Sequence, residues 1–364
     1  MSFPLLKLPY LAIEKVLFHF EPIDLFDISF CSARSYFLVR SLRHPYPLLS
    51  IHISTYKNIK LCSGKTHVSL PEPPYIQRVK SAHWSFIWGN SKKIRKQNEK
   101  LGQVRKIGGV EFKAGKDDCC LTMSSPKEEM RSVVKYIQDL FKVPIHSMSF
   151  SSGGDRKLLP QYFGFQKCED FTLFSFGNKK ILSDDTIRGL IDNLKVTKHL
   201  SLSLQGNPDF RHDAARFSTD QLDVFDARWM SRNTFLSLDC AKISLNYTSF
   251  TSMDFKELVS RWYNSGNDRM VWLKMRVGFS WPPLDWTEFQ AKPWDPNVRG
   301  HWFRMTSLNY HKSTHKLDCS AGMDITRPSD GLTATIVSRG TQMYFVVWHE
   351  RFPNCDGLNH DIFN

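Results

Sequence analysis

Residues 3–34 read FPLLKLPYLAIEKVLFHFEPIDLFDISFCSAR. Apolar residues recur in this stretch with the spacing of one helical face, and proline and polar residues divide it into short segments. Glu21-Pro22 ends the first helix because proline lacks a backbone donor, and Asp24 is expected to cap the second. The three predicted faces are Ile13, Val16, Leu17 and Phe20, then Leu25 and Ile28, then Ala33, Phe37 and Leu38. The stretch therefore predicts three short helices, closed by Pro45 and Pro47.

Three short helices in about forty residues bury too little apolar surface to be stable without a partner. The residues that carry this pattern also resemble an F-box: residues 3–9 with their Leu8-Pro9, the Pro22-Ile23-Asp24-Leu25 break, and Cys31-Ser32-Ala33-Arg34. Tyr36 and Phe37 stand where many F-boxes carry a tryptophan. The alternative is that residues 1–45 form a helical cap on the following domain.

The F-box resemblance implies a function. It implies that residues 1–45 bind a Skp-type adaptor and, through it, a cullin-RING ubiquitin ligase. The chain would then be the substrate-recognition subunit of an SCF-type ligase, a non-catalytic adaptor that acts by holding its substrate close to the conjugating enzyme. The expected docking residues are Leu5, Leu8, Pro9, Ile13, Val16, Leu17, Leu25 and Ile28, some of which must also pack internally.

Residues 46–124 are expected to form a linker with a first strand at Leu49–Ser54 and a basic loop. The interval 92–116 holds nine Lys and Arg residues against two acids. Such a run favours acidic or phosphorylated protein substrates, or it binds nucleic acid phosphates. Phe112 is the one aromatic residue in the run, which argues against a base-stacking platform and makes nucleic acid the second choice.

From Ser125 onward, helix and strand patterns alternate. Ser125, Ser183, Ser218 and Thr251 each stand at the expected start of a helix, with a strand pattern after each. The expected helical residues are Met130, Val133, Val134, Ile137, Leu140 and Phe141; Ile187, Leu190, Ile191 and Leu194; Leu222, Phe225 and Trp229; and Phe255, Leu258, Val259 and Trp262. The expected strands begin at Ser147, Phe171, His199, Thr234 and Met270.

These strand starts lie 24 to 36 residues apart, within the range of leucine-rich solenoids. The predicted fold is therefore mixed α/β: a small three-helix F-box, then an irregular leucine-rich-repeat-like α/β solenoid, then a C-terminal β-hairpin turning at Arg339-Gly340. An α/β sandwich with non-periodic crossovers is the alternative fold.

Roughly residues 210–350 resemble the F-box-associated domain, type 2, of nematode-type F-box proteins. The matching segments are Trp229–Cys240, Phe255–Leu258 with Trp262, Gly322–Ile325, Asp330–Ile336 and Phe345–Trp348. The predicted domains are 1–45 (F-box), 46–124 (linker with the basic loop), 125–350 (substrate recognition) and 351–364 (tail). The resemblance brings no catalytic residue.

The composition excludes several classes of protein. Of 364 residues, 41% are hydrophobic and 23% charged, the balance of a folded chain rather than a disordered or fibrous one. A net charge of +13 favours acidic partners. Eight cysteines without a C-x-x-C pair indicate a reducing compartment, cytoplasmic and/or nuclear, and neither a secretory signal nor a membrane span is expected. The sequon Asn246-Tyr247-Thr248 is then expected to stay unused.

Sequence motifs of the common enzyme classes are missing. There is no nucleophile elbow, P-loop, H-E-x-x-H or dinucleotide fingerprint. His311, His315 and Cys319 would align as zinc ligands on a helix, with His301 as a distant fourth, but the segment lacks the apolar stripe that a helix needs. Neither a cofactor nor a metal is therefore expected.

Overall fold

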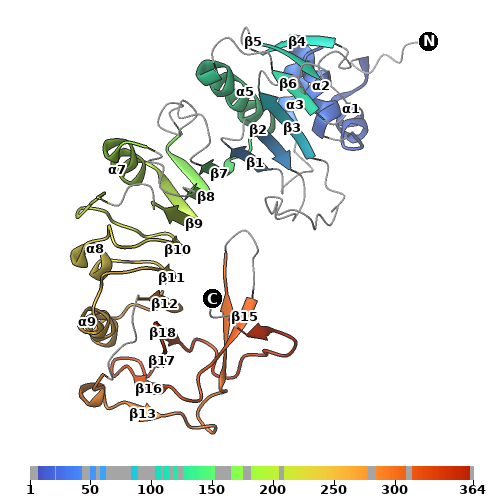
Figure 1. Ribbon diagram of the computed structural model, residues 1–364. Helices are drawn as coiled ribbons and strands as arrows, with labels where there is room; N and C mark the ends of the chain where they lie inside the picture. Colours follow the sequence, from blue (N-terminus) through green and yellow to red (C-terminus); the bar gives the residue numbers. More distant parts are fainter. Residues whose placement is uncertain are drawn as a thin grey trace. The chain divides into compact units, whose positions relative to one another are not determined.

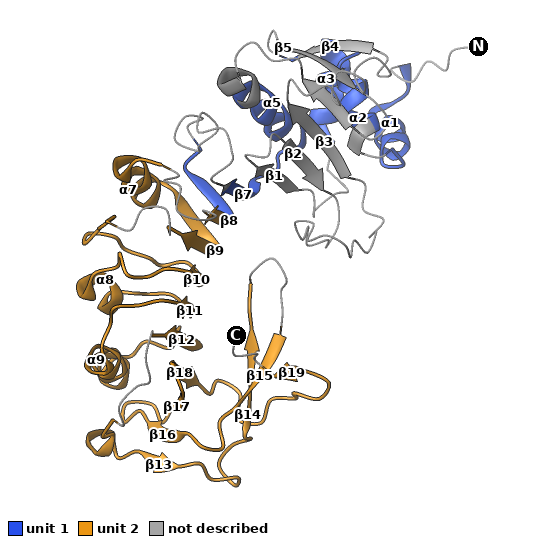
Figure 2. Cartoon of the chain, in the orientation of Figure 1, with its two compact units in different colours: residues 1–169 blue, residues 170–364 orange. Residues whose placement is uncertain are grey.

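The computed structural model describes residues 7–20, 22–42, 50–54, 58–62, 83–88, 103–107, 110–114, 118–121, 126–151, 165–174, 182–204, 209–277, 284–308 and 314–360. The chain forms two compact units, residues 1–169 and 170–364 (Figure 2). Leu5, His311 and residues 92–102 of the basic run lie outside the described residues. The domain boundaries expected at 45, 124 and 350 remain predictions.

The first unit begins with the three predicted helices. They are α1 (Tyr10–Leu17), α2 (Pro22–Ser29) and α3 (Ala33–Ser41). The Ser32 side chain caps α3 by accepting a hydrogen bond from the Ser35 N–H at 3.0 Å. Pro22 is the first residue of α2, where its missing N–H costs nothing. Asp24, expected as a cap, lies instead in the first turn of α2, where its charge favours the helix dipole.

A sheet and a long helix complete the first unit. Its strands run in the order β7-β1-β2-β3-β6-β5-β4, with parallel pairing at β7–β1 and β3–β6. The expected apolar face of α5 is buried from Val133 to Phe141. The elements are β1 (Ser50–Ser54), β2 (Asn58–Cys62), β3 (His83–Trp88), β4 (Gln103–Ile107), β5 (Val110–Ala114), β6 (Asp118–Leu121), α5 (Pro126–Phe141) and β7 (Ile145–Ser151).

The second unit is built on parallel strands in sequence order. β9, β10, β11 and β12 are each the parallel neighbour of the next, and β8 lies beside β9. Figure 1 shows α7, α8 and α9 along one side of these strands and β15 on the other. The elements are β8 (Lys167–Phe174), α7 (Asp184–Asn193), β9 (Lys195–Ser203), β10 (Gln221–Val224), α8 (Arg232–Leu236), β11 (Lys242–Leu245), α9 (Ser252–Tyr263) and β12 (Trp272–Arg276).

One predicted helix–strand unit is wrong. Leu222, expected on a helix that begins after Ser218, lies in strand β10, and Phe235, expected in a strand, lies in helix α8. Leu222 and Val224 are buried and alternate with polar Gln221 and Asp223, which is the two-residue period of a strand. Helix α8 then begins after a Ser231 cap whose hydroxyl accepts from the Thr234 N–H.

Antiparallel strands close the second unit. β18 pairs with β12, and β18, β17, β16 and β13 follow in that order, while β14, β15 and β19 form a separate small sheet. The predicted hairpin is confirmed, because β17 and β18 pair antiparallel around Gly340 at φ +57°. The elements are η3 (Thr287–Phe289), β13 (Lys292–Pro293), β14 (Trp302–Thr306), β15 (Thr314–Asp318), β16 (Met323–Thr326), β17 (Thr333–Arg339), β18 (Gln342–Val347) and β19 (Asn359–His360).

The mixed α/β class, with N-terminal helices and a large sheet, is thus confirmed. In the second unit, helices cover one face of the sheet, and the small sheet covers part of the other face. Trp262 of α9 packs on Phe345 of β18, with ring centroids 5.1 Å apart. On the other side, the small sheet inserts Phe303, Met305 and Leu317 into a core that also contains residues of β12, β17 and β18. That core does not cover the whole β9–β12 face on this side.

Candidate functional site

The predicted adaptor-binding residues divide between the inside and the outside of the three helices. Ile13, Leu17 and Leu25 are buried and form the core between α1, α2 and α3. Leu8, Val16 and Ile28 are half-buried, and Pro9 is exposed. Ile13, Leu17 and Leu25 therefore hold the helices together, and other residues form the surface available to a partner.

An exposed apolar patch lies on the outside of α1 and α3, where sequence reasoning did not place it. It consists of Tyr10, Leu11 and Phe37, whose exposed fractions are 40%, 67% and 60%. The Tyr10 hydroxyl donates a 3.0 Å hydrogen bond to the Ser41 carbonyl, and Phe37 lies one helical turn before Ser41. The patch, called here the F-box patch, therefore joins two helices. Leu11 does not lie on the predicted helical face of Ile13 and Leu17. This was the sequence signal from which its exposure could have been predicted.

An aromatic cluster fixes the three helices to α5. The Tyr136 ring stacks on Phe30, with centroids 5.2 Å apart, and meets Phe26 edge-on at 5.7 Å. Its hydroxyl is hydrogen bonded to the Ser29 Oγ at 2.7 Å. Burial raises the pKa of the Tyr136 phenol above its ordinary value of 10.0. Tyr136 is three residues after Val133, at the edge of the predicted apolar stripe, and this spacing was the available sequence signal for the anchor.

In the second unit, caps and arginines position α8 and α9. Thr251 and Asp254 form the predicted start of α9 as a reciprocal capping box. Arg232 at the start of α8 donates to Asp254 at 2.6 Å and also pairs with Glu257. Burial opposes ionisation of Asp254, but hydrogen bonds from Thr251 and Arg232 outweigh it and hold the pKa of that carboxyl below its usual range. These contacts fix the two helices to each other.

Two fully buried arginines brace the closing strands. Arg299 forms a two-pronged ion pair with Asp324, at 2.6–3.0 Å, and its guanidinium lies 4.7 Å from the Trp348 ring centroid. Arg327 pairs with Asp330 and lies 4.8 Å from the ring centroid of Trp262. Arg299 also donates to the Gly300 and Cys319 carbonyls, and Arg327 to the Asn267 carbonyl, so both arginines act as structural braces.

The described residues offer no metal centre. Among them, no group of three or more His, Cys, Asp or Glu side chains is arranged to hold an ion. His315 lies in strand β15, so the four-residue spacing to Cys319 does not fall on a helix. Burial also raises the pKa of the Cys319 thiol to about 12, which disfavours the thiolate that a metal needs. No helix in the described part of the chain is long and apolar enough to cross a membrane.

Comparisons with known proteins match two segments of the chain to family models. Residues 5–45 match the family described as F-box domain, and residues 212–275 match the family described as F-box associated. The chain therefore carries an F-box and an F-box-associated domain, and the predicted resemblance is confirmed. The second match covers β10, α8, β11, α9 and most of β12.

Three similar chains come from Caenorhabditis elegans. The protein named "Uncharacterized protein F59B2.9" is 28% identical over 366 residues, which cover 97% of this chain and 80% of that one. "Uncharacterized protein F59B2.8" is 24% identical, with 96% and 79% covered. "Uncharacterized protein F54H12.5" is 23% identical, with 95% and 93% covered. No solved structure matches the chain significantly.

Proposed function

We propose that this chain is the substrate-recognition subunit of an SCF-type cullin-RING ubiquitin ligase. The F-box binds a Skp-type adaptor, and the F-box-associated domain binds protein substrates. The observation that carries the proposal is the F-box patch, which leaves three large apolar side chains in solvent while Ile13, Leu17 and Leu25 are buried. Exposed apolar patches of this kind mark protein interfaces. The chain itself is a non-catalytic adaptor in this scheme.

The proposed adaptor surface combines the patch with part of the predicted set. Tyr10, Leu11 and Phe37 make the central contacts, and Pro9 with the exposed sides of Leu8, Val16 and Ile28 extends them. Ile13, Leu17 and Leu25 contribute by holding the helices in place. Aromatic and aliphatic anchors at the centre of an interface supply most of its binding energy.

We further propose that the substrate-recognition domain is an irregular repeat-like α/β solenoid. Its support is the sequential parallel order of β9 to β12, with α7, α8 and α9 along one side. Stacked units of this kind present a broad, rigid surface to a protein partner. We place the protein in the cytoplasm and/or nucleus, where ubiquitin ligases of this class act, and expect acidic or phosphorylated substrates because the chain has a net charge of +13.

Co-purification with a Skp-type adaptor tests this function. The full chain is expected to retain the adaptor, and a Leu11→Glu, Phe37→Ser double variant is expected to weaken binding by about a hundredfold, because it removes two anchors and buries a charge. Both side chains are mostly exposed, so the variant keeps its fold.

Met253→Glu is the matched control. Met253 is an exposed apolar side chain on α9, 63% exposed, outside the F-box. This variant should retain the adaptor like the unmodified chain. Equal retention of the adaptor by all three proteins, or by none of them, would contradict the proposed function.

A further inference from the structure

A row of polar side chains crosses the face of the parallel sheet that is turned away from α8 and α9. The strand register aligns Ser201, Asp223, Ser244 and Lys274 on β9, β10, β11 and β12. The residues on either side of each, such as Ile243 and Leu245 beside Ser244, are buried. The alternation assigns one face to the core and leaves the other as a polar surface.

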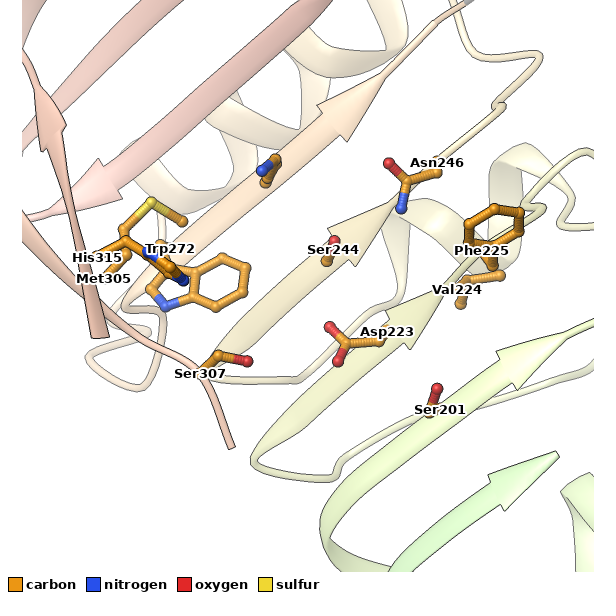
Figure 3. A pocket seen from close by; sticks show the side chains of 11 residues that line it. Ser201, Asp223, Val224, Phe225, Ser244, Asn246, Trp272, Met305, Ser307 and His315 are labelled. Carbon is orange, nitrogen blue, oxygen red and sulfur yellow. The ribbon is translucent and has the colours of Figure 1, made fainter. Parts of the chain in front are cut away.

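This polar row forms the floor of a cavity. Met305, Ser307 and His315, from β14, β15 and the chain between them, form one wall, and Phe225 and Asn246 lie at the opposite end (Figure 3). The cavity holds about 250 Å³. Pockets for whole small molecules are larger, at about 300–1,000 Å³, so this one suits a single side chain of a longer ligand.

The charges in the cavity favour an anionic ligand. The Asp223 carboxylate is already bound by His199 Nε2 at 2.8 Å and by the Gln221 amide at 2.9 Å. On β12, Lys274 lines the cavity, and Arg276 follows on the same face two residues later. Asp223 is the one acidic residue among those that line the cavity, while Lys274 and Arg276 share its face, so positive charge outweighs negative charge there and an incoming carboxylate meets a favourable potential.

An exposed aromatic pair borders the same cavity. Phe225 and Tyr247 are 47% and 43% exposed, and their rings meet edge-on at 5.6 Å. The Arg276 guanidinium lies 5.8 Å from the Tyr247 ring centroid. Tyr247 has φ +50°, a left-handed conformation that is strained for a bulky residue. Strain of this kind, combined with exposure of a large apolar ring, indicates a binding role.

We propose that this cavity and its aromatic border bind an extended peptide segment of a protein partner, with an acidic side chain beside Lys274 and an apolar side chain against Phe225 and Tyr247. The inference rests on the proposed function, since it names the substrate class that the F-box-associated domain takes. Alternate residues of an extended peptide point the same way, so Glu-x-Leu is the simplest matching sequence. None of the residues that line the cavity belongs to the basic run 92–116.

Fluorescence anisotropy with labelled peptide pools tests the proposal on the full chain. The probes are fluorescein-labelled seven-residue pools with a fixed Glu-x-Leu, Gln-x-Leu or Glu-x-Ser core and mixed residues elsewhere. We expect the Glu-x-Leu pool to bind about fivefold more tightly than either of the others, the effect of one charge contact or one apolar contact. Lys274→Glu should abolish the preference for Glu over Gln, whereas Lys292→Glu, the same change at an exposed position in β13, should preserve it.

Tyr247→Gly separates a binding role from a structural one. Glycine adopts positive φ without strain, so this variant should keep or raise the melting temperature while losing about fivefold in affinity for the Glu-x-Leu pool. A variant that loses stability and retains the affinity would show that the ring is structural and overturn its role in the site. Equal binding of the Glu and Gln pools to the unmodified chain would overturn the charge assignment.

The same proteins distinguish this inference from the proposed function. All variants should still co-purify with a Skp-type adaptor, because none lies in the F-box. Adaptor binding without selective peptide binding overturns the inference alone, and selective peptide binding without adaptor binding overturns the proposed function alone. Binding of a single-stranded RNA oligonucleotide, with neither Glu pool retained, would assign the surface to nucleic acid and overturn the inference.

Discussion

The F-box exposes large apolar side chains, whereas the closing strands of the second unit enclose a charged pair. The F-box packs Ile13, Leu17 and Leu25 inside and leaves Leu11 and Phe37 in solvent. The closing strands instead bury the charged pair of Arg299, which precedes β14, and Asp324 of β16. A small helical domain has too few residues to cover all its apolar surface, whereas a broad sheet has room to enclose even ions. The first region therefore needs a partner, and the second is complete in itself.

The largest expected effect comes from breaking the buried ion pair. Arg299→Met leaves the Asp324 carboxylate buried without its cation and removes a contact with Trp348, so the second unit should lose about 3–5 kcal/mol of unfolding free energy. Urea unfolding followed by tryptophan fluorescence measures the loss. Arg304→Met, which breaks an exposed pair with Glu350, is the control and should cost less than about 1 kcal/mol. Equal losses of unfolding free energy in the Arg299 and Arg304 variants would show that burial of the Arg299–Asp324 pair does not contribute to stability.

The next effect tests how closely the closing strands pack. A Cβ at Gly322 would lie 2.5 Å from the Thr335 Cγ2 and 2.9 Å from the Ile336 carbonyl oxygen. Gly322→Ala should therefore cost about 1–3 kcal/mol through forced displacement of β17. Gly266→Ala is the control, because no heavy atom lies within 4 Å of the added Cβ, and it should change stability by less than about 0.5 kcal/mol. Thermal unfolding of both variants measures the difference. Similar melting temperatures for the two variants would contradict this packing.

A smaller effect is expected where the F-box meets α5. Tyr136→Phe keeps the stacked ring and removes the hydrogen bond to Ser29, so it should destabilise the first unit by about 1 kcal/mol. Hydrogen exchange should show faster opening of α2 with unchanged protection of β10 to β12. Tyr263→Phe in α9 should leave α2 protection as it is. Unchanged exchange in α2 of the Tyr136 variant would mean that the anchor depends on the ring alone.

The smallest effect concerns acid stability of the closing strands. Hydrogen bonds from Arg327 and from the Leu332 N–H lower the pKa of Asp330 to about 2, from an ordinary value of 3.8. Because the folded-state pKa is depressed, its contribution is present above about pH 4 and is lost as the pH falls toward 2. Asp330→Asn should therefore lower the melting temperature slightly at pH 6, with the difference disappearing near pH 2. A constant difference across this range would contradict the assignment.

Local sequence signals predicted much of the secondary structure. The caps at Ser183 and Thr251 hold where expected, because a cap depends on groups within three residues of each other. The error at Ser218 has a different origin. Gln221–Val224 is too short to fix its own period, and it becomes a strand because β9 and β11 pair with it on both sides. Non-local pairing thus decided an element that local patterning misread.

The candidate sites show the same division. The sequence indicated the F-box through its Leu8-Pro9 opening and helix spacing, and the docking residues it named include three that the structure buries. It gave no indication of the cavity, because Ser201, Asp223, Ser244 and Lys274 are more than twenty residues apart and meet only through strand register.

The sequence by itself therefore determined the three N-terminal helices, the caps at Ser183 and Thr251, the Arg339-Gly340 turn and the family resemblance, since all of these depend on neighbours along the chain. Tertiary structure alone decided which apolar residues stay exposed, how Tyr136 fastens α2 to α5, and which polar residues share one face of the sheet. Exposure and shared faces depend on contacts between distant segments. Those contacts are set by the packing of whole elements and by strand register, which hydrophobic periodicity does not specify.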